Sequence, residues 1–300
     1  MNWTLDQLRT FLAIHEFGTV SAAADEVHLT PGAVSQQMKA LREAVGKDLF
    51  IKDGRQLMLT DDGHDLVNHA RAILDAELRA ESAMNAGRNL SSQLTVGVFG
   101  SVAVTAMKPT IDYLREIAPQ ISIKAIEVDV AVMASAVADG VIDIALSVNY
   151  PDAPQPPQRG VEIKTLYVEN FDMIVPPDAD INEDDKKSVI AYANATDWVI
   201  PPVETYYGKA IRFACARAAI EPRLVHTVTD TAVSLAMAEA NVGITVATPL
   251  MLQLRPTSAR VVPMPIAFKR EIVAIAKRSS LQRESVQHMN AALKHVFAGL

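Results

Sequence analysis

The fold is decided by residues 18–46, which read GTVSAAADEVHLTPGAVSQQMKALREAVG. Residues 21–27 are rich in alanine and predict a short helix whose small side chains let another helix approach closely. A second helix is predicted after Thr30, because threonine is a good N-cap and Pro31 loses no needed N–H at the first helical position. The buried stripe and the end of this helix are predicted at Val34, Met38, Leu41, Val45 and Gly46.

The segments on either side complete a small winged domain. Upstream, apolar residues follow helical spacing at Leu5, Leu8, Phe11, Leu12 and Ile14. Downstream, residues 49–51 and 57–59 are apolar runs around Asp53-Gly54, which is a hairpin signal. Three helices and a two-stranded wing predict a winged helix-turn-helix over residues 1–60.

A longer helix is predicted from Thr60 to about Asn85. Its apolar stripe is narrow for a globular core and consists of Leu66, Val67, Ala70, Ile73, Leu74, Leu78 and Met84. Such a seam is typical of helix pairing between two subunits, although a lone connector lying on its own domain would give a similar pattern. We expect a dimerisation helix and hinge over residues 61–90.

From Gln93 onward the pattern changes to strands that alternate with helices. The first predicted strands are residues 94–98, 121–128 and 142–148, and the alternation repeats after Leu166 with a polar loop through residues 184–187. This alternation favours a parallel sheet covered on both faces. Two chain crossings, near 165–170 and 267–272, would divide residues 91–300 into lobe I (about 91–165 and 271–300) and lobe II (about 166–270).

Composition excludes several classes of protein. Hydrophobic residues make up 49% and charged residues 21%, which is typical of a globular chain and not of a disordered one. The single cysteine, Cys215, excludes an intrachain disulfide and fits a reducing cytoplasm. The longest apolar run, residues 130–138, is far short of the roughly 20 residues that a bilayer requires, and we expect no secretory signal and no membrane partner.

The net charge of −7 argues against wholesale electrostatic binding of nucleic acid. The charge is uneven, however. Residues 36–58 contain five basic residues, Lys39, Arg42, Lys47, Lys52 and Arg55, against three acidic ones. This positive stripe could serve a polyanion, or it could be an unremarkable fluctuation in charge.

Short motifs in the head keep a fixed order and spacing. They are Leu8-Arg9-Thr10-Phe11, Gly18-Thr19-Val20-Ser21-Ala22-Ala23-Ala24, Ala33-Val34-Ser35-Gln36-Gln37-Met38, Leu49-Phe50, and Leu59-Thr60 with Gly63. Two weaker motifs follow collinearly, Gly140-Val141-Ile142-Asp143-Ile144-Ala145 and Val242-Gly243-Ile244 with Pro249. With these motifs the chain resembles the LysR-type transcriptional regulators over its whole length. The resemblance implies an α+β winged helix-turn-helix head and an α/β two-lobed, periplasmic-binding-protein-like effector domain.

Three positions depart from the family pattern. Pro31-Gly32 stands where the family usually has Gln-Pro, which puts one base contact of the family in doubt. Lys52 replaces the usual wing arginine and keeps a point charge for a phosphate. Leu41-Arg42 replaces the usual Leu-Glu.

The resemblance, together with major-groove chemistry, predicts the DNA-binding residues. Small residues allow close approach, Gln36 can pair bidentately with adenine, and Ala33 can meet a thymine methyl. Basic residues would hold phosphates and fix register. The predicted set is Ser21, Thr30, Pro31, Gly32, Ala33, Ser35, Gln36, Lys39, Arg42, Lys52 and Arg55. Gln36 could instead be a solvated side chain, and Arg42 could pair with Glu43 or Asp48.

The resemblance also places an effector site between the lobes. The predicted residues are Ser101, Val102, Asp129, Val130, Ser147, Pro202, Thr205, Thr229 and Thr231. Helix N-termini at Ser101 and Thr231 would favour a carboxylate, and nearby acidic residues would favour an amino acid zwitterion. A capping or turn role without ligand contact is the alternative for each residue. Tyr206 and Tyr207 would be lid residues or packed ones.

These observations predict a cytoplasmic, ligand-responsive transcriptional regulator. Its expected partners are double-stranded operator DNA, a small-molecule effector, a second copy in a homodimer or homotetramer, and RNA polymerase. A cytoplasmic small-molecule-binding protein or an enzyme of solute-receptor architecture is the alternative. We expect no enzyme activity, cofactor or metal site, because no phosphate loop, nucleophile elbow or His-Glu-x-x-His run is present and the histidines are scattered.

Overall fold

The protein is described here from a computed structural model, and the described residues are 2–53, 56–85 and 92–300. The chain forms two compact units, Met1–Asn89 and Leu90–Leu300. Each unit has its own hydrophobic core. We call the first unit the head and the second the two-lobed unit.

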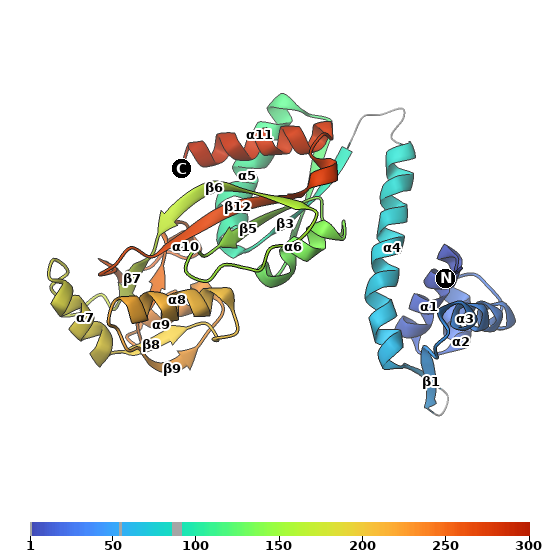
Figure 1. The fold of residues 1–300 in the computed structure, drawn as a ribbon, viewed down its shortest axis with the longest axis horizontal. Helices are drawn as coiled ribbons and strands as arrows, with labels where there is room; N and C mark the ends of the chain where they lie inside the picture. The colour runs from blue at the N-terminus through green and yellow to red at the C-terminus, as the bar shows by residue number, and fades with distance from the viewer. Residues whose placement is uncertain (1, 54–55, 86–91) are drawn as a thin grey trace. The chain divides into compact units, whose positions relative to one another are not determined.

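The head contains three short helices, a hairpin and a long helix. In chain order these are α1 (Leu5–Phe17), α2 (Val20–Glu26), α3 (Pro31–Val45), β1 (Phe50–Asp53), β2 (Gln56–Leu59) and α4 (Asp61–Asn85) (Figure 1). The side chains of Thr4, Thr19 and Thr30 each accept a hydrogen bond from a backbone N–H three residues further on, which satisfies a donor that the helix start would leave free. The predicted winged helix-turn-helix is confirmed.

Helix α1 lies at the centre of the head and packs against α2, α3 and α4. One side of it buries Phe11 against Leu41 of α3, and the other side buries Ile14 against the alanines of α2. The small residues of α2 therefore allow the close helix approach that the sequence predicts. Gly63, in the first turn of α4, has no room for a side chain, because a Cβ there would lie 2.3 Å from the backbone oxygen of Leu49.

The first half of α4 completes the core of its own head. Leu66, Val67 and Ala70 are buried there, and Ile73 and Leu74 are partly buried against the same cluster. This part of the stripe packs within one chain, while the side chains of Leu78 and Met84 lie outside the described part. Helix α4 has 25 residues, yet among the described residues no helix is both long and apolar enough to cross a membrane.

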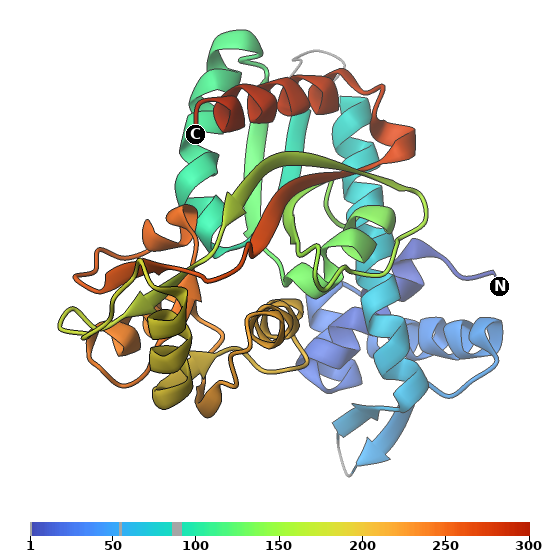
Figure 2. The same ribbon diagram turned by 60° about the vertical axis from the view of Figure 1, so that its left-hand side comes forward.

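Lobe I is a five-stranded sheet with helices on both faces (Figure 2). The strand order is β4-β3-β5-β12-β6, formed by β3 (Ser92–Val98), β4 (Ile121–Glu127), β5 (Ile144–Asn149), β6 (Val161–Asn170) and β12 (Lys269–Lys277). Helices α5 (Gly100–Ile117) and α11 (Glu284–Ala298) pack on one face, and α6 (Val130–Ala138) packs on the other. A 3-10 turn, η1 (Arg278–Ser280), follows β12.

Lobe II contains five short strands and four helices. The strands are β7 (Asp172–Val175), β8 (Asp197–Ile200), β9 (Arg223–Thr227), β10 (Thr245–Ala247) and β11 (Arg260–Pro263). Strands β10 and β11 flank β7 in antiparallel fashion, β8 and β9 are parallel, and a bridge from the fully buried Trp198 to Ile244 joins the two groups. The helices are α7 (Lys186–Ala195), α8 (Tyr206–Arg217), α9 (Thr231–Glu239) and α10 (Pro249–Leu252).

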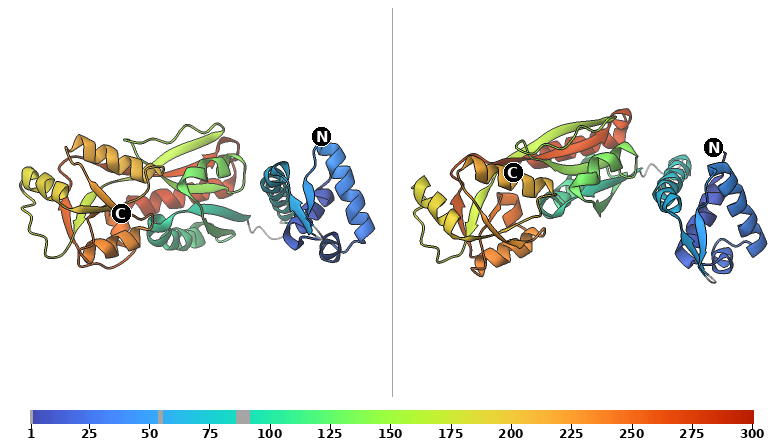
Figure 3. Two further views of the ribbon diagram at one scale, coloured as in Figure 1. Left: turned by 90° about the horizontal axis from the view of Figure 1, so that it is seen from below. Right: turned by 60° about the horizontal axis from the view of Figure 1, so that its bottom comes forward.

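The two chain crossings between the lobes lie side by side. Strands β6 and β12 are antiparallel neighbours over most of their length (Figure 3), and beyond their ends the Phe171 N–H donates to the Phe268 carbonyl oxygen at 2.9 Å. Lobe II is therefore an insertion between two adjacent strands of lobe I.

Several sequence expectations need correction. The sheet of lobe I is mixed and not purely parallel, because β12 returns from lobe II and pairs antiparallel with β5 and β6. In lobe II, β7 pairs antiparallel with both of its neighbours, and only β8 and β9 are parallel among the described strands. The polar loop through residues 184–187 ends sooner than predicted: Asp185 caps α7, whose buried stripe is only Val189 and Ala193. The alternation of apolar runs in the sequence did not predict three further elements, which are short or half-exposed: β6, β11 and α10.

Candidate nucleic-acid interface and inter-lobe site

One face of α3 is buried and the opposite face is open. Val34 and Leu41 are fully buried, whereas Gly32, Ser35 and Gln36 are exposed. Ala33 is half-buried, and its backbone N–H donates to the Thr30 hydroxyl at 3.2 Å. The open face is therefore flat and begins with small residues, so that Gln36 can reach a partner without a large side chain in front of it.

The remaining polar side chains of this surface differ in their contacts. The Ser35 hydroxyl donates to the carbonyl oxygen of Pro31 at 2.9 Å, which holds the first turn of α3. Ser21 is exposed near the start of α2. Gln36 makes no side-chain hydrogen bond with any described residue, so its amide is available to a ligand.

The charged residues of this surface divide into paired and unpaired ones. Arg42 lies 3.3 Å from the carboxylate of Asp48, so it forms the surface pair that the sequence leaves open as the alternative to a phosphate contact. Lys39 is 4.0 Å from Glu43, an exposed contact of small energetic value. Lys52 is exposed on the wing and has no acidic partner among the described residues, while Arg55 lies outside them.

The predicted inter-lobe residues begin at the N-terminus of α5. Ser101 and Val102 are buried in its first turn, and no side chain caps this helix. The Ser101 hydroxyl accepts a hydrogen bond from Arg270 Nη2 at 3.1 Å. Ser101 is therefore part of a buried polar network and is not a free hydroxyl.

Capping explains two of the other predicted positions, Asp129 and Thr205. The carboxylate of Asp129 accepts the Ala131 N–H at 2.8 Å and starts α6, next to the half-buried Val130. The Thr205 hydroxyl accepts the Gly208 N–H at 2.9 Å and starts α8. Both residues have the capping role that the sequence leaves open, and Thr205 also donates to the Pro202 carbonyl oxygen.

The last predicted positions differ in burial. Ser147 is fully buried on β5, and its hydroxyl has no hydrogen-bond partner among the described residues. Thr229 is exposed, and Thr231 is half-buried at the first position of α9, where Asp230 is the capping residue. The side chains of Asp129, Ser147 and Thr229 form no hydrogen bond with the Ser101 network within the described part.

A buried ion pair that the sequence analysis missed lies between the lobes. Glu169 at the end of β6 and Arg270 at the start of β12 face each other across the strand pair, with Arg270 Nη2 2.6 Å from Glu169 Oε1 and both side chains 2% exposed. Glu169 also accepts the backbone N–H of Leu250 in α10 at 3.1 Å. The pair thus links lobe I, through Ser101, to lobe II, through Leu250. The available signal was one charged residue, Glu169, at the first predicted crossing and three at the second, Lys269, Arg270 and Glu271.

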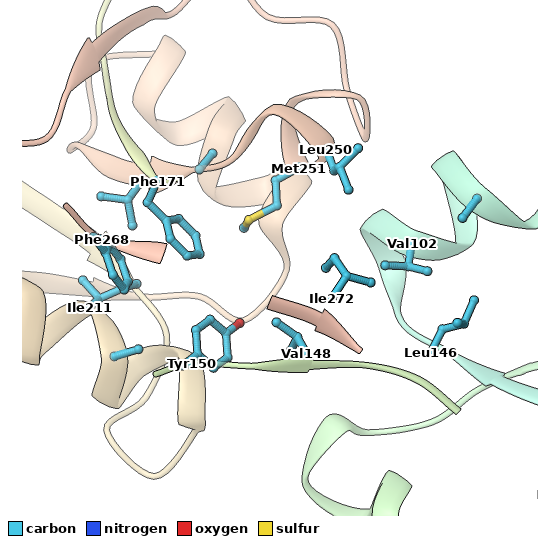
Figure 4. Packing of buried hydrophobic residues seen from close by; sticks show 14 of the residues in the cluster. Val102, Leu146, Val148, Tyr150, Phe171, Ile211, Leu250, Met251, Phe268 and Ile272 are labelled. Atoms are coloured by element: carbon cyan, nitrogen blue, oxygen red, sulfur yellow. The ribbon is translucent and has the colours of Figure 1, made fainter. Parts of the chain in front are cut away.

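Aromatic rings fill the space beside this ion pair. Phe171 and Phe268 stack at 4.3 Å, and Tyr207 of α8 stacks on both Phe171 and Tyr150. Figure 4 shows Tyr150 among Phe171, Phe268 and Val148. Burial raises the pKa of Tyr150 to about 12, against the opposing effect of the Arg270 guanidinium beside it. Tyr207 is a packed residue whose hydroxyl donates to the Val246 carbonyl oxygen at 2.7 Å.

Within residues 2–53, 56–85 and 92–300, no group of three or more His, Cys, Asp or Glu side chains is arranged to hold a metal ion. The thiol of Cys215 is buried in α8, and burial raises its pKa to about 12, so it is not an activated nucleophile.

Comparisons with known proteins agree with this architecture. The family model described as "LysR substrate binding domain" matches residues 87–298, and "Bacterial regulatory helix-turn-helix protein, lysR family" matches residues 5–64. The chain is 32% identical to the HTH-type transcriptional regulator PecT of Dickeya dadantii over 152 residues, which cover 51% of this chain and 48% of PecT. It is 26% identical to the HTH-type transcriptional regulator ClcR of Pseudomonas putida over 80% of this chain and 81% of ClcR.

The fold has solved counterparts as well. The crystal structure of full-length CbnR complexed with its target DNA superimposes with a TM-score of 0.77 at 19% identity, covering 98% of this chain and 99% of CbnR. The likeness at this identity concerns the fold. Because family models match both units, the chain belongs to the LysR family of bacterial helix-turn-helix regulators.

Proposed function

We propose that this protein regulates transcription by binding an operator through α3 and the wing, and that a small molecule bound between lobes I and II controls it. The observation that carries the DNA-binding part is the open face of α3. This face begins with small residues, and the side-chain amide of Gln36 on it has no hydrogen-bond partner among the described residues. Lys52 on the neighbouring wing likewise has no acidic partner among them. This is the arrangement in which a recognition helix reads base edges while basic residues hold phosphates.

The division of labour follows the units of the chain. Residues 1–60 are the proposed DNA-binding domain, residues 61–90 the linker that pairs two chains, and residues 91–300 the effector-binding domain. Residues 1–60 carry six lysines and arginines against seven aspartates and glutamates, so one head binds DNA weakly by itself. Two heads on one dimer raise the affinity through effective concentration. The DNA complex known for CbnR supports the proposal by analogy. In this function the protein has no catalytic role and works in the cytoplasm, where its DNA is.

The proposed effector is a small molecule with a carboxylate. The uncapped N-terminus of α5 and the guanidinium of Arg270 favour an anionic group, while Glu169 balances that charge. The buried hydroxyl of Ser147 has no partner among the described residues and is available to such a ligand. Effector binding would shift the population of lobe arrangements and, through the linker, the position of the two heads on DNA.

The test is a titration of the full-length protein with its own upstream intergenic DNA at several salt concentrations, with unrelated DNA as competitor. Lys52→Gln should reduce the slope of log K against log salt by about one per bound head, and the exposed Lys124→Gln on β4 is the matched control. Gln36→Ala should reduce the preference for operator over competitor by about 1–3 kcal/mol. An unchanged preference and slope in both head variants would contradict the assigned surface.

A further inference from the structure

A cavity lies at the hinge, where the chain crosses between the lobes. Its volume is about 320 Å³. One wall is residues 170–172 of the first crossing, the other is residues 264–268 of the second crossing, and Lys186 at the start of α7 also lines it. This volume is at the lower end of the range of about 300–1,000 Å³ that is typical of small-molecule sites.

Two opposite charges line this cavity without meeting. Asp172 is half-buried at the start of β7, and it forms no ion pair with Lys186 or with any other described residue. Burial raises the pKa of the Asp172 carboxyl, against the opposing effect of a hydrogen bond from the Met264 backbone N–H. Lys186 is exposed and likewise has no acidic partner among the described residues. A carboxylate and an ammonium that share a cavity yet do not pair leave room for a ligand that carries the complementary charges.

Polar atoms form most of the remaining wall, because Met264, Pro265, Phe171 and Phe268 are buried and turn little surface toward the cavity. The half-buried Ile266 offers an apolar contact there. This contact suits a short aliphatic side chain. A charged end at Asp172, a charged end at Lys186 and a small apolar contact beside them define the ligand class.

We propose that this hinge cavity is a second binding site, separate from the inter-lobe site, for a small amino acid. The ammonium group of the ligand binds Asp172, its carboxylate binds Lys186, and its side chain contacts Ile266. Charge-assisted contacts at both ends make the site selective for the zwitterion over an amine or a carboxylic acid alone.

The position of the cavity couples it to the inter-lobe site. Phe171 and Phe268 line the cavity and also belong to the aromatic stack with Tyr207. Both cavity walls are crossing segments, so a ligand that bridges them favours one hinge angle over another. If the proposed regulatory function holds, the hinge ligand changes the affinity for the inter-lobe effector, and the coupling is reciprocal.

The test uses the full-length protein and the free L-amino acids, one at a time, with thermal unfolding as the screen and calorimetry for the affinity. We expect at least one amino acid to bind, and Asp172→Asn and Lys186→Gln each to weaken it by about 10-fold or more. The matched controls are Asp184→Asn and Lys187→Gln, which change exposed residues outside the cavity lining and should retain wild-type affinity.

A second series keeps the test decisive if a variant folds poorly. On the wild-type protein, the N-acetyl derivative and the amide of the same amino acid each lack one charge and should bind about 10-fold or more weakly. The proposal is overturned if no amino acid binds, if both charge-deleted derivatives bind as well as the parent, or if folded Asp172→Asn and Lys186→Gln proteins retain full affinity. Operator retention without ligand, measured on the same variants, tests the regulatory function separately and should not change.

Discussion

Removing the carboxylate of Glu169 should be among the most damaging single changes in the two-lobed unit. Glu169→Ala deletes an acceptor of Arg270 Nε at 2.7 Å, of Arg270 Nη2 at 2.6 Å and of the Leu250 N–H at 3.1 Å. It leaves a guanidinium that is 2% exposed without its counter-charge. Breaking a buried pair from one side costs about 3–5 kcal/mol of unfolding free energy. With an m-value of about 2–3 kcal/mol per molar urea, the midpoint should fall by about 1–2.5 M.

The assay is urea unfolding followed by the fluorescence of Trp198, which is fully buried in lobe II. A Trp3→Phe background removes the signal of the head, so that only the two-lobed unit is reported. The double variant Glu169→Leu with Arg270→Met removes both charges together, and its loss should be well below the sum of the two single losses. A loss under 1 kcal/mol for Glu169→Ala, or additive losses in the double variant, would refute the assigned role of the pair.

Three further predictions concern separate parts of the chain. Leu41→Ala should cost the head about 2–5 kcal/mol, because the side chain is fully buried between α1 and α4, and circular dichroism of the thermal transition checks this. The Ser258 hydroxyl and N–H, with Arg255, lower the pKa of Glu239 to about 2, so its stabilising effect is complete above pH 4.5 and is lost as the pH falls toward 2. The difference in Tm between wild type and Glu239→Gln should therefore shrink on acidification over that range. With its pKa raised to about 12, Cys215 should react with a thiol reagent at pH 8 only after unfolding, and a fast native reaction would contradict its burial.

The sequence predicts the head in detail and the two-lobed unit in outline. Helix α3 carries its own punctuation, a threonine cap with Pro31 at the start and Gly46 at the end, so its limits follow from local chemistry. Helix α7 has no long apolar stripe, because only Val189 and Ala193 are buried in it. Its first residues are charged and resemble a solvated loop. The antiparallel course of β12 depends on where lobe II returns the chain, which local periodicity does not encode.

The candidate sites were predictable to different degrees. The open face of α3 follows from the helical period, since the exposed positions are those left over by Val34 and Leu41. The inter-lobe site depends on contacts between residues 81 to 169 positions apart, and local periodicity does not encode their register. Glu169 and Arg270 are therefore missed, and Ser101 is predicted without its partner.

The insertion of lobe II between β6 and β12 also bears on the order of folding. Lobe II is continuous along the chain between its two crossings, so its contacts can form as soon as residue 268 has been synthesised. Lobe I is discontinuous, because its strand β12, which lies between β5 and β6, arrives last together with α11. Nascent lobe I therefore exposes the edges of β5 and β6 for the time that about 100 residues take to emerge, roughly 5–20 s at common synthesis rates. Unpaired edges of this kind favour wrong pairing, so lobe I is the part of the protein that should depend most on chaperones and on an intact C-terminus.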